Sequence, residues 1–204
     1  INVTVEDDSP ILVKNGTTII LDEKYLVLGS EPQSSEISKI GTLEVNWGAD
    51  SGSEKDVQFT EKTKLDLENW AKNNSSPFSV VISEDGHTLT AKDGEKELFE
   101  VTLSINTAGN VEYQVTFKNA LDHKTLTDFN LPITSLEITD ADGDSVTGEF
   151  NITVIDDNPK PEDIKKVEVN EDLYLPTGEK STNTFNTNAD ATGTNTTIDG
   201  GGKT

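Results

Sequence analysis

Short runs in which apolar and polar residues alternate recur along most of the chain. In "TLEVNW" (Thr42–Trp47) and "EFNITVI" (Glu149–Ile155) the apolar residues recur at every second position, which is the period of a strand with one buried face. Turn-forming pairs such as Asp85-Gly86 separate the runs. The pattern predicts strands over Val3–Val5, Thr18–Leu21, Thr42–Trp47, Val57–Thr60, Phe78–Ile82, Thr88–Ala91, Leu98–Ile105, Val111–Phe117, Leu131–Ile138 and Phe150–Ile155.

A single segment, "TKLDLENWAKNN" (Thr63–Asn74), has a helical pattern, and it is short. Many short strands joined by turns, with one helix at most, are typical of an all-β protein in which two sheets pack face to face. The sequence therefore predicts a β-sandwich.

One strand motif occurs twice. "NVTVEDDSP" (Asn2–Pro10) and "NITVIDDNP" (Asn151–Pro159) share six of nine residues and lie 149 residues apart. A further acidic pair follows each copy: Asp22-Glu23 after the first and Glu171-Asp172 after the second. A fixed long period that ends in the same motif predicts tandem modules.

The repeat also predicts where the modules begin and end. Residues 1–10 would be the end of the preceding module or a first strand, 11–158 would form a complete β-sandwich module, and 159–204 would begin the next module or a linker. The last segment is rich in Thr, Asn and Gly and poor in apolar residues, so alone it would bury little surface. Because the first residues already have a strand pattern, we expect the chain to be a piece of a longer one.

The composition of the chain argues against some classes of binding partner and favours others. The 204 residues include 38 acidic and 16 basic side chains, for a net charge of −22, and 32% are apolar. Such a charge repels nucleic acid and anionic membranes, and no apolar run approaches the length of a membrane-spanning helix. The acidity is suited to binding cations, although solubility alone would also explain it. There is no cysteine, so a secreted form would need something other than disulfides to brace the fold.

The stretch Asp140-x-Asp142-Gly143-Asp144 has the spacing of a calcium-binding turn. Calcium takes six to eight oxygen ligands, and alternate Asp side chains on a tight turn converge on one point. An EF-hand is excluded because its bidentate Glu would fall at Asn151 and no flanking helices are predicted. The alternative to a calcium site is a solvated Asp-Gly hairpin.

A second group of carboxylates is predicted at the module junctions. Asp156 and Asp157 follow the next strand, which separates them from the loop by a strand length of roughly 20 Å. Asp7 and Asp8 occupy the equivalent positions at the start of the chain. Each pair is expected to meet the acidic pair that follows it, and calcium would relieve the repulsion between them. For Asp7 and Asp8 the expected partners are Asp22 and Glu23.

The stretches "GTLEVNWGAD", "DGHTLTAKDGEKELFEVTL", "NALDHK" and "ITDADGDSVTGEFNITVIDDNP" resemble the repeats of about 150 residues in giant RTX-class adhesins that bacteria export by type I secretion. The resemblance covers Gly41 to Pro159, and the closing motif is its most specific part. It implies a calcium-dependent, immunoglobulin-like or cadherin-like antiparallel β-sandwich at the bacterial cell surface. The helical segment departs from the plain repeat, and the glycine-rich calcium nonapeptide of RTX proteins is absent.

The leading hypothesis is therefore a calcium-stabilised structural (extender) module of a large secreted adhesin that supports cell adhesion and biofilm formation. Its partners would be neighbouring modules of the same chain. The alternative is a ligand-binding adhesin domain that recognises a cell-surface glycan or peptide, with Trp70 as the ligand-binding candidate. Trp47 is expected in the core, and His87 and His123 on the surface. No catalytic motif is present, so the chain is not expected to be an enzyme.

Overall fold

The computed structural model describes residues 8–49, 52–122 and 128–157, all of which belong to one compact unit that ends at Pro161. The predicted strand Val3–Val5 lies outside the described residues. In chain order the elements are β1 (Ile11–Lys14), β2 (Ile19–Asp22), the 3-10 helix η1 (Glu23–Tyr25), β3 (Ser38–Asn46), β4 (Asp56–Gln58), α1 (Glu61–Asn73), β5 (Ser79–Ile82), β6 (Thr88–Asp93), β7 (Lys96–Ile105), β8 (Val111–Phe117), β9 (Asp128–Thr139) and β10 (Ser145–Ile155).

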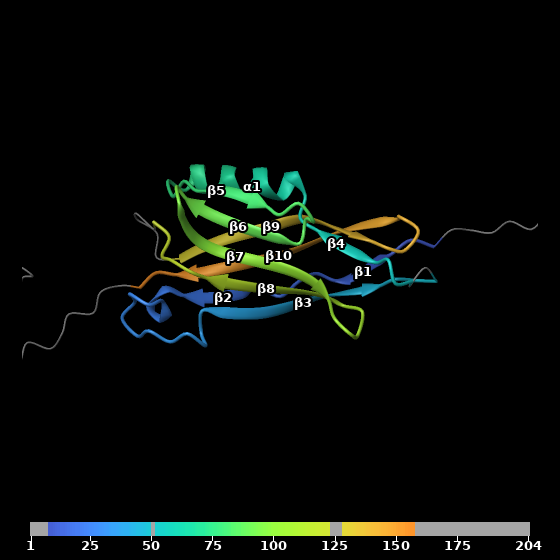
Figure 1. Cartoon of the computed structure of the whole chain (residues 1–204), viewed down its shortest axis with the longest axis horizontal. Coiled ribbons are helices and arrows are strands. Elements are labelled where there is room, and N and C mark those ends of the chain that lie inside the picture. Colours follow the sequence, from blue (N-terminus) through green and yellow to red (C-terminus); the bar gives the residue numbers. More distant parts are fainter. Residues whose placement is uncertain (1–7, 50–51, 123–127, 158–204) are drawn as a thin grey trace, which may run out of the picture. The chain divides into compact units, whose positions relative to one another are not determined.

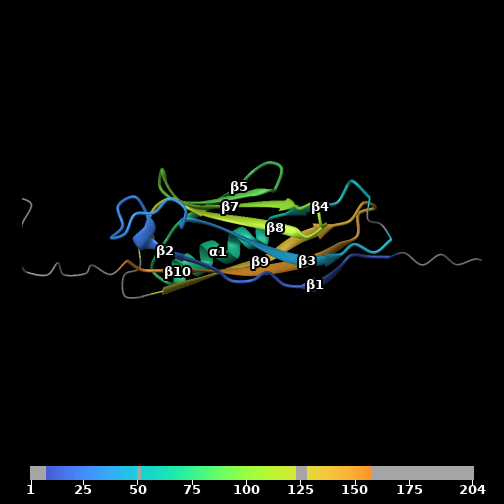
Figure 2. The ribbon, with the colours of Figure 1, turned by 90° about the horizontal axis from the view of Figure 1, so that it is seen from below.

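The strands form two sheets that face each other, which confirms the predicted all-β sandwich (Figure 1). The larger sheet has the order β1-β3-β8-β7-β6-β5 and the smaller one the order β2-β10-β9-β4. Figure 2 shows the two layers, with β7 and β8 in one and β9 and β10 in the other. Neighbouring strands are antiparallel except β2 and β10, which run parallel with Asp22 opposite Ile155.

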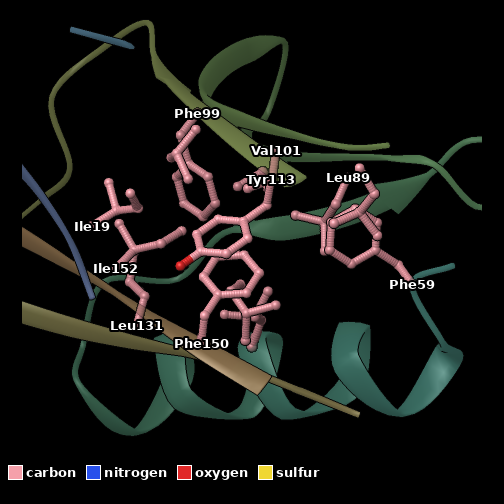
Figure 3. Packing of buried hydrophobic residues seen from close by; sticks show 14 of the residues in the cluster. Ile19, Phe59, Leu89, Phe99, Val101, Tyr113, Leu131, Phe150 and Ile152 are labelled. Carbon is pink, nitrogen blue, oxygen red and sulfur yellow. The ribbon is translucent and has the colours of Figure 1, made fainter. Parts of the chain in front are cut away.

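The core lies between the sheets and is built from the apolar positions of the alternating strands. Along β8 every second residue is buried, from Val111 to Phe117, as are Phe150 and Ile152 on β10 (Figure 3). Tyr113 is fully buried, its ring stacks on Phe150 with 3.8 Å between centroids, and its hydroxyl donates to a backbone carbonyl. The period of two seen in the sequence therefore identifies the inner face correctly.

Helix α1 occupies the predicted position, within two residues at its start. The Thr60 hydroxyl accepts a hydrogen bond from the backbone N–H of Thr63 and caps the first turn. Thr63, Leu67 and Ala71 recur every four residues, lie on one helical face and are fully buried. That face packs against β9 of the smaller sheet and β5 of the larger one.

The helix also covers strand edges that would otherwise expose backbone groups. Two threonine hydroxyls at its start donate to the carbonyl oxygens of Thr134 and Ser135 on β9. Further along, the Glu68 carboxylate accepts the backbone N–H of Val80 on β5 at 2.8 Å. Uncovered edges are the usual sites of unwanted strand pairing, so α1 closes one side of the sandwich.

The direction of the strands gives the module two distinct ends. β2 and β10 both finish at one end, which we call the exit end and define as Asp22–Ser30 with Asp156–Asp157. The hairpin loop between β9 and β10 lies at the other end, called the entry end and defined as Asp8–Pro10, Gly48–Ala49 and Asp140–Asp144. Strand β1, which the alternation pattern did not predict, leads away from the entry end.

Candidate metal centre

The predicted calcium turn is a tight hairpin loop between β9 and β10. The backbone N–H of Asp140 donates to the carbonyl of Asp144 at 2.9 Å and closes the loop. Gly143 has a φ of +107°, a conformation that side chains oppose. The flanking elements are strands, in agreement with the exclusion of an EF-hand.

Three carboxylates meet at this loop. Ligand oxygens of Asp140, Asp142 and Asp144 all lie within 4.8 Å of one another. Two oxygens that bind the same calcium ion, each at roughly 2.3–2.6 Å, are separated by no more than about 5 Å. Across the described ranges, this is the one set of three or more His, Cys, Asp or Glu side chains that meets this condition. The three oxygens can therefore ligate one ion.

The burial and hydrogen bonding of Asp140 are a second feature that suits a metal-ligating side chain. Its side chain is buried, and its Oδ1 accepts the backbone N–H groups of Gly143 at 3.1 Å and of Asp144 at 2.9 Å. Its Oδ2 is buried and has no hydrogen-bond partner. A buried carboxylate oxygen without a partner is costly unless something compensates for it. A divalent cation would supply that compensation.

The loop holds Asp140 in its ionised form. Burial acts to raise the pKa of this carboxyl, and the hydrogen bonds from the backbone of Asp144 and Gly143 are among the effects that lower it. The net effect lowers the pKa of Asp140 below its usual value. The site therefore offers negative charge at neutral pH, as a hard cation such as calcium requires.

The start of the chain is hydrogen-bonded to the acidic loop of Asp140, Asp142 and Asp144. The Ser9 hydroxyl donates to Asp144 Oδ2 at 2.6 Å, and Asp8 accepts the backbone N–H of Ala49 at 2.8 Å. Asp8 therefore lies at the entry end, whereas Asp22 ends β2 at the exit end. The expected meeting of Asp8 with Asp22 and Glu23 is wrong, because the chain must run the length of β1 and β2 between them. Ser9 was not predicted, since a single serine carries no recognisable signal.

At the exit end the predicted carboxylates bind protein donors. Asp22 accepts the backbone N–H of Lys24 at 3.0 Å and caps η1, and the buried Glu23 accepts the N–H of Leu121 at 2.8 Å. Asp157 accepts both the N–H and the hydroxyl of Ser30. Asp156 follows β10 beside the end of β2. Asp7, Glu171 and Asp172 lie outside the described residues, so a junction calcium site stays a prediction.

The two tryptophans both pack against the core. Trp47 is buried as predicted, and its indole N–H donates to the carbonyl of Gly109 at 2.5 Å. Trp70 is partly buried, and its ring meets Phe129 edge to face with 5.2 Å between centroids. This packing contact accounts for Trp70 without a ligand.

His87 forms an ion pair with Asp56 of β4, which pairs with Thr139 of β9. Its Nε2 lies 2.7 Å from Asp56 Oδ1, and its Nδ1 lies 3.5 Å from Asp85. The hydrogen bond with Asp56 is the largest effect on the pKa of His87; burial opposes it, and the net shift is upward. His87 is therefore a surface histidine with a structural partner, while His123 lies outside the described residues.

The pair of His87 and Asp56 should contribute to the stability of the fold in a pH-dependent way. Since the folded pKa of His87 is raised, its pair with Asp56 stabilises the fold in full below the unfolded pKa of about 6.5 and is lost as the pH rises through the folded value. Replacing His87→Asn should lower the free energy of unfolding by about 0.2–1 kcal/mol at pH 5.5, as for exposed ion pairs, and by less at pH 8.5. Urea denaturation at both pH values measures this, and an equal loss at both would contradict it.

Comparison of the chain with protein-family models, with curated proteins and with solved structures finds no match. In the described part, no helix is both long enough and apolar enough to cross a membrane. The function has to be inferred from the residues themselves.

Proposed function

We propose that this chain carries a calcium-stabilised extender module of a large bacterial surface adhesin, in which the ion is held by Asp140, Asp142 and Asp144. The buried Oδ2 of Asp140, which lacks a hydrogen-bond partner and lies beside two further carboxylates, is the observation that carries the proposal. An ion at this point would be bound by the native hairpin and not by the unfolded chain. Its binding energy therefore adds to the free energy of unfolding.

The position of the loop supports a structural role for the ion. Bound there, calcium would fix the turn between the two longest strands, β9 and β10. It would also act on the start of the chain, since Asp144 accepts the hydroxyl of Ser9. The ion would thus brace both the smaller sheet and the segment through which the preceding module enters.

The wider role rests on the sequence. The repeated Asp-Asp-x-Pro motif supports a tandem array, and the acidity and the absence of cysteine suit a chain that is exported unfolded and folds in external calcium. The resemblance to RTX-class adhesin repeats supports an extracellular location, with adhesion and biofilm formation as the role of the whole protein. The ligand-binding alternative draws no support from Trp70, whose ring packs on Phe129.

Calcium titration tests the site. Replacing Asp142→Asn together with Asp144→Asn removes two charged ligands and should weaken calcium binding at this loop by at least about tenfold, because affinity follows ligand charge. Isothermal titration calorimetry would measure the affinity and the number of bound ions. The control, Glu84→Gln with Asp93→Asn, removes the same charge from exposed positions elsewhere. An unchanged titration in the loop variant would refute the assignment.

A further inference from the structure

The repeat makes Asp8 and Asp157 equivalent positions, one at the start of the module and one at its end. The equivalence extends beyond the motif, since Tyr25 and Leu26 match Tyr174 and Leu175 at the same spacing of 149 residues. The structure therefore shows the same aspartate in two settings. Asp8, at the entry end, contacts the module that follows it in the chain. Asp157, at the exit end, contacts the module that precedes it in the chain.

At the entry end the carboxylate of Asp8 packs closely against the turn of Gly48 and Ala49. Its Oδ2 accepts the backbone N–H of Ala49 at 2.8 Å. Gly48, at a φ of +63°, lies directly against it, and a Cβ there would be 2.3 Å from the same oxygen. Only glycine allows both the conformation and the close approach, so the backbone of this turn is shaped around a carboxylate.

At the exit end the equivalent carboxylate has other donors. Asp157 Oδ2 accepts the backbone N–H of Ser30 at 2.6 Å, and its Oδ1 accepts the Ser30 hydroxyl at 2.7 Å. An ionised carboxylate has about four acceptor positions. One aspartate can therefore accept the two donors of Ser30 and the N–H of Ala49 at the same time.

We infer that in a tandem array this single aspartate joins two copies of the module, by accepting Ser30 of the preceding copy and Ala49 of the following one. The inference rests on the proposed function, in that it requires successive copies of the module. It specifies which surfaces face each other: the exit end of one copy lies against the entry end of the next. The contact needs no metal ion.

The exit end has the exposed apolar surface that such a contact would cover. Val27 is 81% exposed and Leu28 is 97% exposed, next to the turn that holds Ser30. Both line a hollow together with Lys96 and Asp157, where the described chain leaves the module. The occupant is the entry end of the following copy, because the chain has only Asn158 between Asp157 and the proline equivalent to Pro10.

Amide exchange in a duplicated chain tests the bridge. Residues 10–158 are inserted a second time directly after Asn158 of the full chain, each copy is isotope-labelled in turn, and exchange is followed by NMR in EGTA. Replacing the first copy's Asp157→Ala should speed exchange at least about tenfold both at Ser30 of the first copy and at Ala49 of the second. In the original chain the same replacement should affect Ser30 alone.

Two controls make the result specific. Asp156→Ala removes the same charge one residue away and should leave both amides protected. Val27→Ser with Leu28→Ser should loosen the two copies, so that residual dipolar couplings no longer fit one common alignment, whereas Leu65→Ser with Val81→Ser, at exposed positions on α1 and β5, should not.

The outcomes separate the inference from the function on which it rests. Faster exchange at Ser30 but not at Ala49 of the second copy, in a chain whose copies both fold and bind calcium, would overturn the bridge and leave the extender module standing. A second copy that folds neither in EGTA nor in calcium would overturn both.

Discussion

Millimolar calcium should raise the melting temperature of the chelated chain by about 5–11 °C. One site at 100 times its dissociation constant adds about 2.7 kcal/mol to the free energy of unfolding, and 1 kcal/mol shifts the melting temperature of a domain of this size by about 2–4 °C. The physical source is the loop of Asp140, Asp142 and Asp144, which exists as a cluster only in the folded hairpin. Differential scanning calorimetry in EGTA and in calcium measures the shift.

Two comparisons make this result specific to the loop. Magnesium at the same concentration should raise the melting temperature less, because it dehydrates reluctantly and demands a strict octahedron. The variant with Asp142→Asn and Asp144→Asn should lose the calcium-dependent rise while keeping its far-UV β-sheet spectrum. Identical melting curves of the original chain in EGTA and in calcium would contradict the calcium proposal.

The replacement Gly41→Ala should lower the free energy of unfolding by about 3 kcal/mol, the upper end of the range for overpacking, and the melting temperature by about 6–12 °C. A Cβ at Gly41 would lie 2.3 Å from Cζ of Tyr113. That ring cannot move away, since it is fully buried and stacked on Phe150. Urea denaturation with circular dichroism provides the measurement.

A double-mutant cycle identifies the cause. Tyr113→Leu removes the ring atoms that the new methyl group would meet, at a cost of its own. If the clash is the cause, the combined variant with Gly41→Ala should lose less stability than the sum of the two single losses, by about 1–3 kcal/mol. Additive losses would show that Gly41 matters for another reason.

The local sequence is sufficient to predict most of the fold. Short runs rich in β-branched or aromatic residues, many of them alternating with polar ones, identify nine strands within the described residues, and the helical pattern of Thr63–Asn74 marks α1 within two residues of its start. These features depend on neighbouring side chains, which decide between a strand with one buried face and a helix. Strand β1 was missed because only its Leu12 is partly buried and the flanking Ile11 and Val13 are exposed, so it has no alternation toward the core.

The cluster of three carboxylates was predictable for the same reason. Asp140, Asp142 and Asp144 lie within five residues, and Gly143 permits the bend, so a single turn of backbone is enough to bring them together. The junction carboxylates were not predictable in this way. The prediction that Asp8 meets Asp22 was wrong, because β2 pairs in parallel with β10 and places Asp22 at the exit end.

Contacts between distant segments depend on how the sheets stack. No pattern around Gly41 indicates that the ring of Tyr113 fills its place, and none around Gly48 indicates a cradle for Asp8. Likewise Ser9 reaches Asp144 across 135 positions of the chain. Turns, strands and the acidic loop of Asp140–Asp144 follow from residues a few positions apart, whereas the glycine contacts and the two ends of the module exist only because hydrophobic burial brings β3, β8 and β10 together.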